Sequence, residues 1–285
     1  MYAAALRSDA RETDFDPLAS VRSRGVLALV AHVQDGVTRR ARTREEGALR
    51  MRFPHERADR LDAVTVNVAG GMAGGDVYDC AFAAEAGARL AVTSTAAEMV
   101  YRALGAPTRC DVLLRAEGGA ILVYAPQEAI LFDRARIARR YEIDVAAAAR
   151  LIVADAVILG RAAMGEDVTS LVWRDSWRLR RDGALVWADA TRVEGDATAL
   201  LSASATGAGA RAFATLLYAA ADAAEQIEPL RDVLRDAKEC EAAATCFEGL
   251  LVARLVARDG HRLRAALAAA ISALPGGALP RSWST

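Results

Sequence analysis

The chain repeats one pattern in Ala84-Glu85-Ala86-Gly87-Ala88-Arg89-Leu90-Ala91-Val92, in Ala116-Glu117-Gly118-Gly119-Ala120-Ile121-Leu122-Val123-Tyr124 and in Val145-Ala146-Ala147-Ala148-Ala149-Arg150-Leu151-Ile152-Val153. Each copy is a turn followed by an apolar strand. The last alanine before the strand falls at Ala88, Ala120 and Ala149, so the copies are 32 and 29 residues apart. A repeat near 30 residues with two strands per unit predicts stacked coils or layered sheets.

The segments on either side of the repeats also read as strands. Leu49, Met51 and Phe53 alternate with arginines, as the residues of a half-buried strand do. Further along, Arg181-Asp182-Gly183 separates two apolar runs, and Asp-Gly suits a tight hairpin turn. We therefore predict a β-rich body over residues 23–195, in which the tryptophans of the later strands pack the sheet.

The last part of the chain has a different character. Residues 196–210 are rich in Ala, Ser, Thr and Gly and are predicted to form a loop. Over 211–285 we expect mixed α/β structure, with Pro229 opening a short helix and Asp259 capping a second one. The predicted fold is mainly β, a β-helix-like or layered body with a small C-terminal α/β section of about two helices.

Composition limits the classes of partner. The formal net charge is −1, which gives no general attraction to nucleic acid or to an anionic membrane. No long apolar stretch lacks charges, and residues 1–22 read as a flexible charged lead, not a signal peptide. The four cysteines form no CxxC pair, so a reduced, cytoplasmic protein is expected. Residues 23–285 are expected to form one domain.

Motifs for common catalytic and metal sites are missing from the sequence. The glycine cluster 70–75 is followed by Asp76 and lacks the Gly-Lys-Ser/Thr of a phosphate loop, so a tight turn is the alternative reading. The three histidines lack metal-binding spacing, and no tightly bound cofactor is expected. Glu128 and Glu166 could form the acid pair of a carbohydrate-active enzyme, or they could be turn acids.

Five segments stand out in order along the chain: 70–76, 93–95 running into 99–102, 126–128 with 130–133, 159–161 with 165–166, and 279–283. Taken in this order, they resemble the UreD (UreH) family of urease accessory proteins. The resemblance runs from about residue 25 to the end of the chain. The motif residues that match the family are Gly70, Gly71, Gly74, Gly75, Tyr101, Arg102, Pro126, Gln127, Gly160, Arg161 and Gly165. The fifth segment is Leu279-Pro280-Arg281-Ser282-Trp283, which is similar to the family's usual ending.

The resemblance implies a β-helical body and a non-enzymatic role in nickel delivery. It implies a cytoplasmic complex with UreF and, through that complex, with the GTPase UreG, docked on apo-urease. GTP hydrolysis would then belong to the partner, as the missing phosphate loop suggests.

A delivery protein must release nickel, which a full set of Cys and His ligands would retain. We expect a transient nickel(II) path, with Asp76 and Glu166 as the first candidates to line it and Glu128 as a third. Each could equally be a structural turn acid. A pure adaptor that never contacts nickel remains an alternative, as does the carbohydrate-active enzyme.

Overall fold

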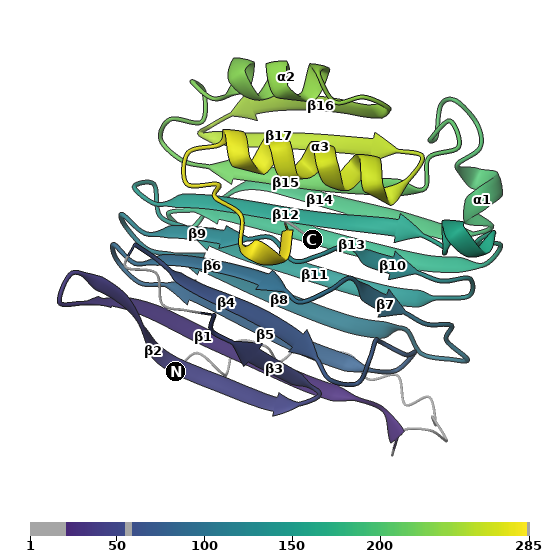
Figure 1. Cartoon of the computed structure of the whole chain (residues 1–285), viewed down its shortest axis with the longest axis horizontal. Coiled ribbons are helices and arrows are strands. Elements are labelled where there is room, and N and C mark those ends of the chain that lie inside the picture. The colour runs from purple at the N-terminus through teal and green to yellow at the C-terminus, as the bar shows by residue number, and fades with distance from the viewer. Residues whose placement is uncertain (1–20, 55–58, 284–285) are drawn as a thin grey trace.

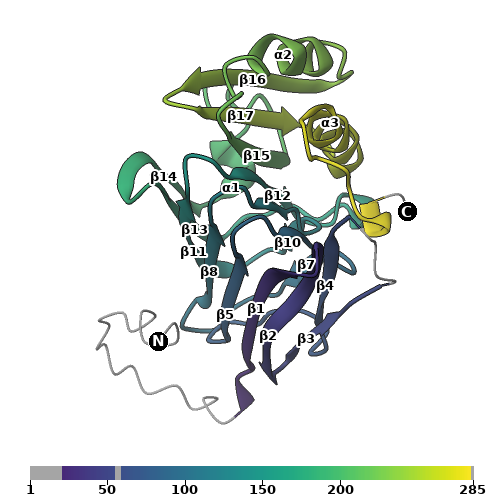
Figure 2. The same cartoon turned by 90° about the vertical axis from the view of Figure 1, so that its left-hand side faces the viewer.

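A computed structural model of the chain describes residues 21–54 and 59–283. Most of the predicted lead, residues 1–20, lies outside the described residues. The chain forms two facing β-sheets, A and B, joined by turns into stacked coils (Figure 1). Seen from the side, the coils begin at β1 to β3 and lead up to a helical section around α2 and α3 (Figure 2). The predicted mainly β fold with stacked coils is confirmed.

The repeated stretches are the turns of consecutive coils. In each turn the buried alanine donates its backbone N–H across three residues: Ala88 to Glu85, Ala120 to Glu117 and Ala149 to Ala146, each at 2.9 Å. Every turn links a strand of sheet A to a strand of sheet B. The linked strands are β5 (Val77–Ala84) and β6 (Arg89–Ser94), β8 (Thr108–Ala116) and β9 (Ile121–Tyr124), and β11 (Arg136–Val145) and β12 (Arg150–Leu159).

Sheet A has the order β14-β13-β11-β8-β5-β1-β2, parallel from β13 to β1 with an antiparallel strand at each edge. Both edge strands arise from two-residue hairpins in which an aspartate and a glycine adopt positive φ. The predicted Asp182-Gly183 turn is one of them. The strands added here are β1 (Arg24–Gln34), β2 (Val37–Gly47), β13 (Leu171–Arg181) and β14 (Ala184–Gly195).

Sheet B has the order β16-β17-β15-β12-β9-β6-β4-β3. It is parallel from β4 to β12 and antiparallel from β12 to β16. Two short strands, β7 (Glu98–Val100) and β10 (Ala129–Leu131), pair with each other, and β10 also pairs with β12. The remaining strands are β3 (Leu49–Arg52), β4 (Leu61–Asn67), β15 (Ala212–Ala219), β16 (Cys240–Phe247) and β17 (Leu250–Ala257).

Helices α2 (Ile227–Arg235) and α3 (Gly260–Ala273) form the predicted mixed section with β15 to β17. Pro229 lies in the first turn of α2, and Asp259 caps α3 by accepting the N–H of Arg262 at 2.8 Å. The segment 196–210 is not wholly a loop: it begins with the short helix α1 (Ala197–Leu200), because Asp196 accepts the N–H of Ala199. No helix within the described residues is long and apolar enough to cross a membrane.

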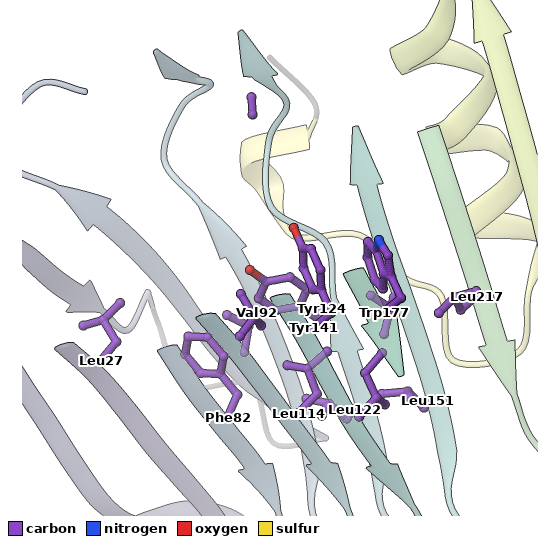
Figure 3. Packing of buried hydrophobic residues seen from close by; sticks show 14 of the residues in the cluster. Leu27, Phe82, Val92, Leu114, Leu122, Tyr124, Tyr141, Leu151, Trp177 and Leu217 are labelled. Carbon is purple, nitrogen blue, oxygen red and sulfur yellow. The ribbon is translucent and has the colours of Figure 1, made fainter. Parts of the chain in front are cut away.

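Two hydrophobic clusters hold the layers together. One fills the space between sheets A and B, and the other packs the outer face of β15 to β17 against the helices. Figure 3 shows Phe82, Tyr124, Tyr141 and Trp177 in the first cluster, which confirms the predicted packing role of the tryptophans in β13. Inward-facing side chains alternate along each strand, so any polar residue with that parity is held inside the solenoid.

Candidate functional site

The predicted motifs stack on one another at one end of consecutive coils. Backbone hydrogen bonds link them: Met72 N–H to Met99 O at 2.8 Å, Phe132 N–H to Val100 O at 3.1 Å, and Gly160 N–H to Leu131 O at 2.8 Å. We call segments 70–76, 98–102, 129–133 and 160–166 the motif column. Residues that are 90 positions apart in the sequence thus form one continuous surface.

Aromatic contacts join the segments of the motif column. The Tyr101 hydroxyl donates to Gly70 O at 2.8 Å, and its ring meets Phe132 edge-on with centroids 5.3 Å apart. The Arg161 guanidinium lies 4.4 Å from the centroid of the Phe132 ring. Gly71 has no room for a side chain, because a Cβ atom there would lie 2.5 Å from the Tyr101 ring.

The remaining motif residues lie in the turns and bridges of the same column. Arg102 pairs with Ala135 in an antiparallel bridge, and a Cβ atom at Gly74 would lie 2.3 Å from the Ala103 methyl group. Positive φ angles occur at Gly75, Gly160 and Gly165.

Asp76 is buried and accepts three hydrogen bonds. Its Oδ1 atom accepts the Ser23 N–H at 2.8 Å, and Oδ2 accepts the Ala73 N–H at 2.8 Å and the Tyr78 hydroxyl at 3.2 Å. These bonds tie the glycine turn to the start of β1. The geometry gives Asp76 a structural role, and its predicted place on a nickel path stays a prediction.

Glu166 is held inside its own motif. Its carboxylate accepts the Arg161 N–H at 2.9 Å, the Arg161 Nε–H at 2.8 Å and the Asp133 N–H at 3.2 Å. Hydrogen bonding from the Arg161 side chain holds the pKa of Glu166 below its usual range. Glu166 therefore carries a negative charge at neutral pH and fixes the last two segments of the column to each other.

Glu128 lies where the C-terminal motif meets the coils. Arg264 of α3 donates to the side chains of both Gln127 and Glu128, the latter at 3.1 Å. Gln127 donates in turn to Ser282 O at 3.1 Å, and Trp283 Nε1 donates to Ala125 O at 3.0 Å. The 126–128 and 279–283 motifs thus form one contact between the solenoid and its C-terminal section.

A cavity of about 250 Å³ lies between the sheets and reaches the surface beside the exposed residues Gly70 and Thr95 of the column end. Two acids line it, Glu98 and Asp155, and neither belongs to the acids predicted from the motifs. Glu98 accepts from Asn67 Nδ2 at 2.9 Å. Burial raises the pKa of Glu98 to about 7. Other motif and interior residues that line the cavity are Gly71, Met72, Pro126, Gln127, Ala129, Cys80 and Cys110.

The inner end of this cavity is a buried ion cluster. Arg139 donates from Nη1 and Nη2 to Asp155 at 2.9 and 2.8 Å, and from Nε and Nη2 to Asp175 at 2.8 and 2.5 Å. The Tyr141 hydroxyl donates to Asp155 Oδ1 at 2.8 Å. All three charged residues are less than 9% exposed. Paired burial of this kind avoids the large cost of an isolated internal charge.

A second cavity of about 240 Å³ lies beyond the cluster, between β13 and β14 on one side and β12, β15 and β17 on the other. Asp155, Asp175, Trp173 and Trp177 line it. Among the described residues, no group of three or more His, Cys, Asp and Glu side chains is arranged to hold a metal ion.

Comparison with known proteins assigns the chain to a family. The family model described as UreD urease accessory protein matches residues 23–284. The chain belongs to the UreD family. It is 43% identical over 268 residues to urease accessory protein UreD of Rhodopseudomonas palustris, covering 93% of this chain and 95% of that one. Identity to urease accessory protein UreD of Xanthobacter autotrophicus is 47% over 264 residues, covering 93% and 91%. Identity to UreD 3 of a Bradyrhizobium species is 42% over 278 residues, covering 98% and 99%.

Membership in the UreD family confirms the resemblance and supports a role in urease maturation. The motifs in the sequence of this UreD chain do not include the buried acids Asp155 and Asp175. One signal was available for Asp155, a charge in the middle of the apolar run from Leu151 to Leu159. A second was Asp175, which has the same parity as its neighbours Trp173 and Trp177 in β13 and so faces inward with them.

Proposed function

We propose that this chain is a cytoplasmic, non-enzymatic scaffold of urease maturation, required for nickel insertion into apo-urease. It acts in a complex with UreF and the GTPase UreG, and nickel(II) passes through its interior. The observation that carries the proposal is the cavity that opens at the motif column and holds Glu98 inside it.

The chemistry of the cavity suits an ion that must be released. Because the pKa of Glu98 is about 7, this carboxyl is only partly ionised at neutral pH. It can therefore attract a cation although it does not carry a full negative charge. Burial raises the pKa of the Cys110 thiol to about 12 and that of Cys80 well above its usual value. A protonated thiol is a weak ligand, since the thiolate is the form that binds metals. The cavity therefore attracts nickel through Glu98 but holds no thiolate that would retain it.

The three acids predicted from the motifs are engaged elsewhere by donors of the chain. Asp76 binds the start of β1, Glu166 binds Arg161, and Glu128 binds Arg264. They share no partner, so the geometry gives no support to an acid pair of a carbohydrate-active enzyme. For the nickel path it favours Glu98 ahead of them.

A pure adaptor is the second candidate, and the motif column favours it. The column holds its segments together through structural contacts, which would equally serve to present a rigid surface to UreF or urease. On this account the interior cavity has no role, and substitutions inside it leave urease activation unchanged.

Two variants of the cavity separate the candidates. Glu98→Gln keeps the size of the side chain and removes its charge, and Ala129→Leu fills the cavity without a change of charge. Each variant is coexpressed with UreF, UreG and urease, and the purified complex, the nickel content of urease and its activity are measured. We expect the complex to assemble and the nickel content to fall.

Ile130→Leu is the matched control, because Ile130 follows Ala129 in β10 and does not line the cavity. Full nickel loading with both cavity variants would support the adaptor and end the proposal of an internal path. Loss of the complex itself would show that the substituted residue is structural.

A further inference from the structure

The loop 103–107, which joins β7 to β8 (Figure 1), projects a leucine into solvent. Leu104 is 81% exposed, the highest value among the large hydrophobic residues that the structure describes. The loop leaves the motif column directly after Arg102. A single exposed leucine is ordinary on a protein surface, whereas one placed among groups that suit a protein interface indicates a contact site.

The base of this loop is held firmly. The Ala103 N–H donates to Arg134 O at 2.9 Å, and the Thr108 hydroxyl donates to Ala73 O at 2.7 Å. Pro107 restricts one φ angle within the loop. Because both ends of the loop are fixed to neighbouring coils, little conformational entropy would be lost when a partner binds its tip.

Four arginines surround the base of the loop. Two of them flank the loop in sequence, and the other two belong to the next coil. A backbone bridge to Ala135 brings the coils together here, and the pairing of β8 with β11 continues this contact. The arginine cluster consists of Arg102, Arg109, Arg134 and Arg136, all of them exposed.

The arginine cluster carries more positive charge than its neighbours neutralise. Asp133 and Asp111 each lie within 4 Å of one member, at 3.5 and 3.7 Å, and Asp111 also pairs with Arg140. Arg102 and Arg136 form no ion pair with any residue that the structure describes. Arginine is enriched in protein interfaces, and charged patches there meet patches of opposite sign. The complement of this surface is an apolar pocket with an acidic rim.

We propose that Leu104 and the arginine cluster form a docking surface for a partner protein that presents such a pocket. Leu104 enters the pocket, and the arginines pair with the acids of its rim. The inference rests on the proposed function, because the partner is one of the proteins of the proposed maturation complex. It does not depend on a nickel path through the interior.

Two variants of the full chain test the docking surface. Leu104→Asp places a charge at the tip of the loop, and the double variant Arg102→Glu with Arg136→Glu reverses the charges that have no ion pair. Each tagged chain is coexpressed with UreF, UreG and urease, and the amount of each partner retained is measured at low and at high salt. The substituted side chains are exposed, so the fold is expected to persist, and thermal unfolding checks this.

We expect both variants to retain about tenfold less of one partner than the wild type does at low salt. The wild type should lose the same partner at high salt, because salt screens exposed charges. Leu185→Asp and Arg89→Glu are the matched controls. Both side chains are exposed, and they lie near the hairpin and the repeated turns at the other end of the coils.

Retention of every partner by both folded variants would overturn the docking surface and leave the proposed function standing. Equal loss in the two controls would also overturn it, because the effect would not be specific to this surface. Size-exclusion chromatography of the chain alone tests another occupant: a dimer that Leu104→Asp dissociates would assign the surface to a second copy and overturn the proposal. A wild-type chain that retains no partner would refute the proposed complex and the docking surface together.

Discussion

Tyr141 and Trp177 are register partners in β11 and β13, and their rings stack with centroids 3.6 Å apart and planes 5° from parallel. The stack fixes the Tyr141 ring so that its hydroxyl meets Asp155 in the opposite sheet. An apolar contact within sheet A thereby orients a polar contact between the sheets.

Replacement of Tyr141 by phenylalanine should keep this stack and remove the hydrogen bond to Asp155. We expect the free energy of unfolding to fall by about 1.5–3 kcal/mol, the range for a hydrogen bond to a charged group. Urea denaturation followed by tryptophan fluorescence measures the change. An unchanged midpoint would mean that the hydroxyl contributes nothing to the cluster.

Glu98→Gln should alter the pH dependence of stability. The pKa of Glu98 is raised to about 7 in the folded chain, above its value in the unfolded chain, so the folded state binds the proton more tightly. Stability from this group is therefore present at acid pH and falls as the pH rises from about 4.5 to 7. Urea denaturation at pH 5 and pH 8 should show a smaller decline for Glu98→Gln, by about 2 kcal/mol after allowance for partial exposure. Parallel profiles for the two proteins would contradict this.

Gly71→Ala should disrupt the motif column, and Gly70→Ala should do so far less. Both glycines have positive φ, at 138° and 74°, but a Cβ atom at Gly71 meets the Tyr101 ring and Met99 O, while Gly70 has open space. The left-handed conformation costs about 1–2 kcal/mol at Gly70, and the collision at Gly71 adds to this cost. Thermal unfolding of the two variants gives the comparison, and equal losses would argue against the collision.

Arg264→Met should release the C-terminal motif from the coils. Arg264 donates to Gln127, Glu128 and Ser282 O, and its guanidinium lies 4.7 Å from the centroid of the Trp283 ring. We expect amide hydrogen exchange to rise around 279–283, with a loss of about 1–3 kcal/mol in local stability. Arg262→Met, in the first turn of the same helix, is the control. Unchanged exchange in Arg264→Met would show that the remaining contacts, such as Gln127 to Ser282 O and Trp283 to Ala125 O, hold the segment without Arg264.

The repeat at Ala88, Ala120 and Ala149 was enough to predict the stacked coils, because a turn that must fit between two sheets leaves the same small buried residue at each level. The hairpin at Asp182-Gly183 was predictable for a similar local reason. Strand β2 was not, since its residues are polar and largely exposed, and its pairing with β1 is satisfied by backbone hydrogen bonds alone.

The residues of the candidate site also differ in how far the sequence predicts them. The residues of the motif column were named through the resemblance to the UreD family, whereas their stacking was not predicted, because the contacts join segments about 30 residues apart in the chain. The cluster of Arg139, Asp155 and Asp175 could not be assembled from the sequence, since it depends on the register of three strands and on the facing of two sheets. Glu98 was hidden for another reason: only the cavity distinguishes it from an ordinary surface acid.

The order of strands in sheet A follows the order of the chain from β1 through β5, β8 and β11 to β13. Each new strand pairs with a strand that was synthesised before it. The coils can therefore assemble in the direction of synthesis, and each new contact closes only a short loop. The carboxylates of Asp155 and Asp175 are made after Arg139, within two successive strands. Because an unpaired buried guanidinium is costly, we expect the interior around Arg139 to close only after β12 and β13 have added both carboxylates.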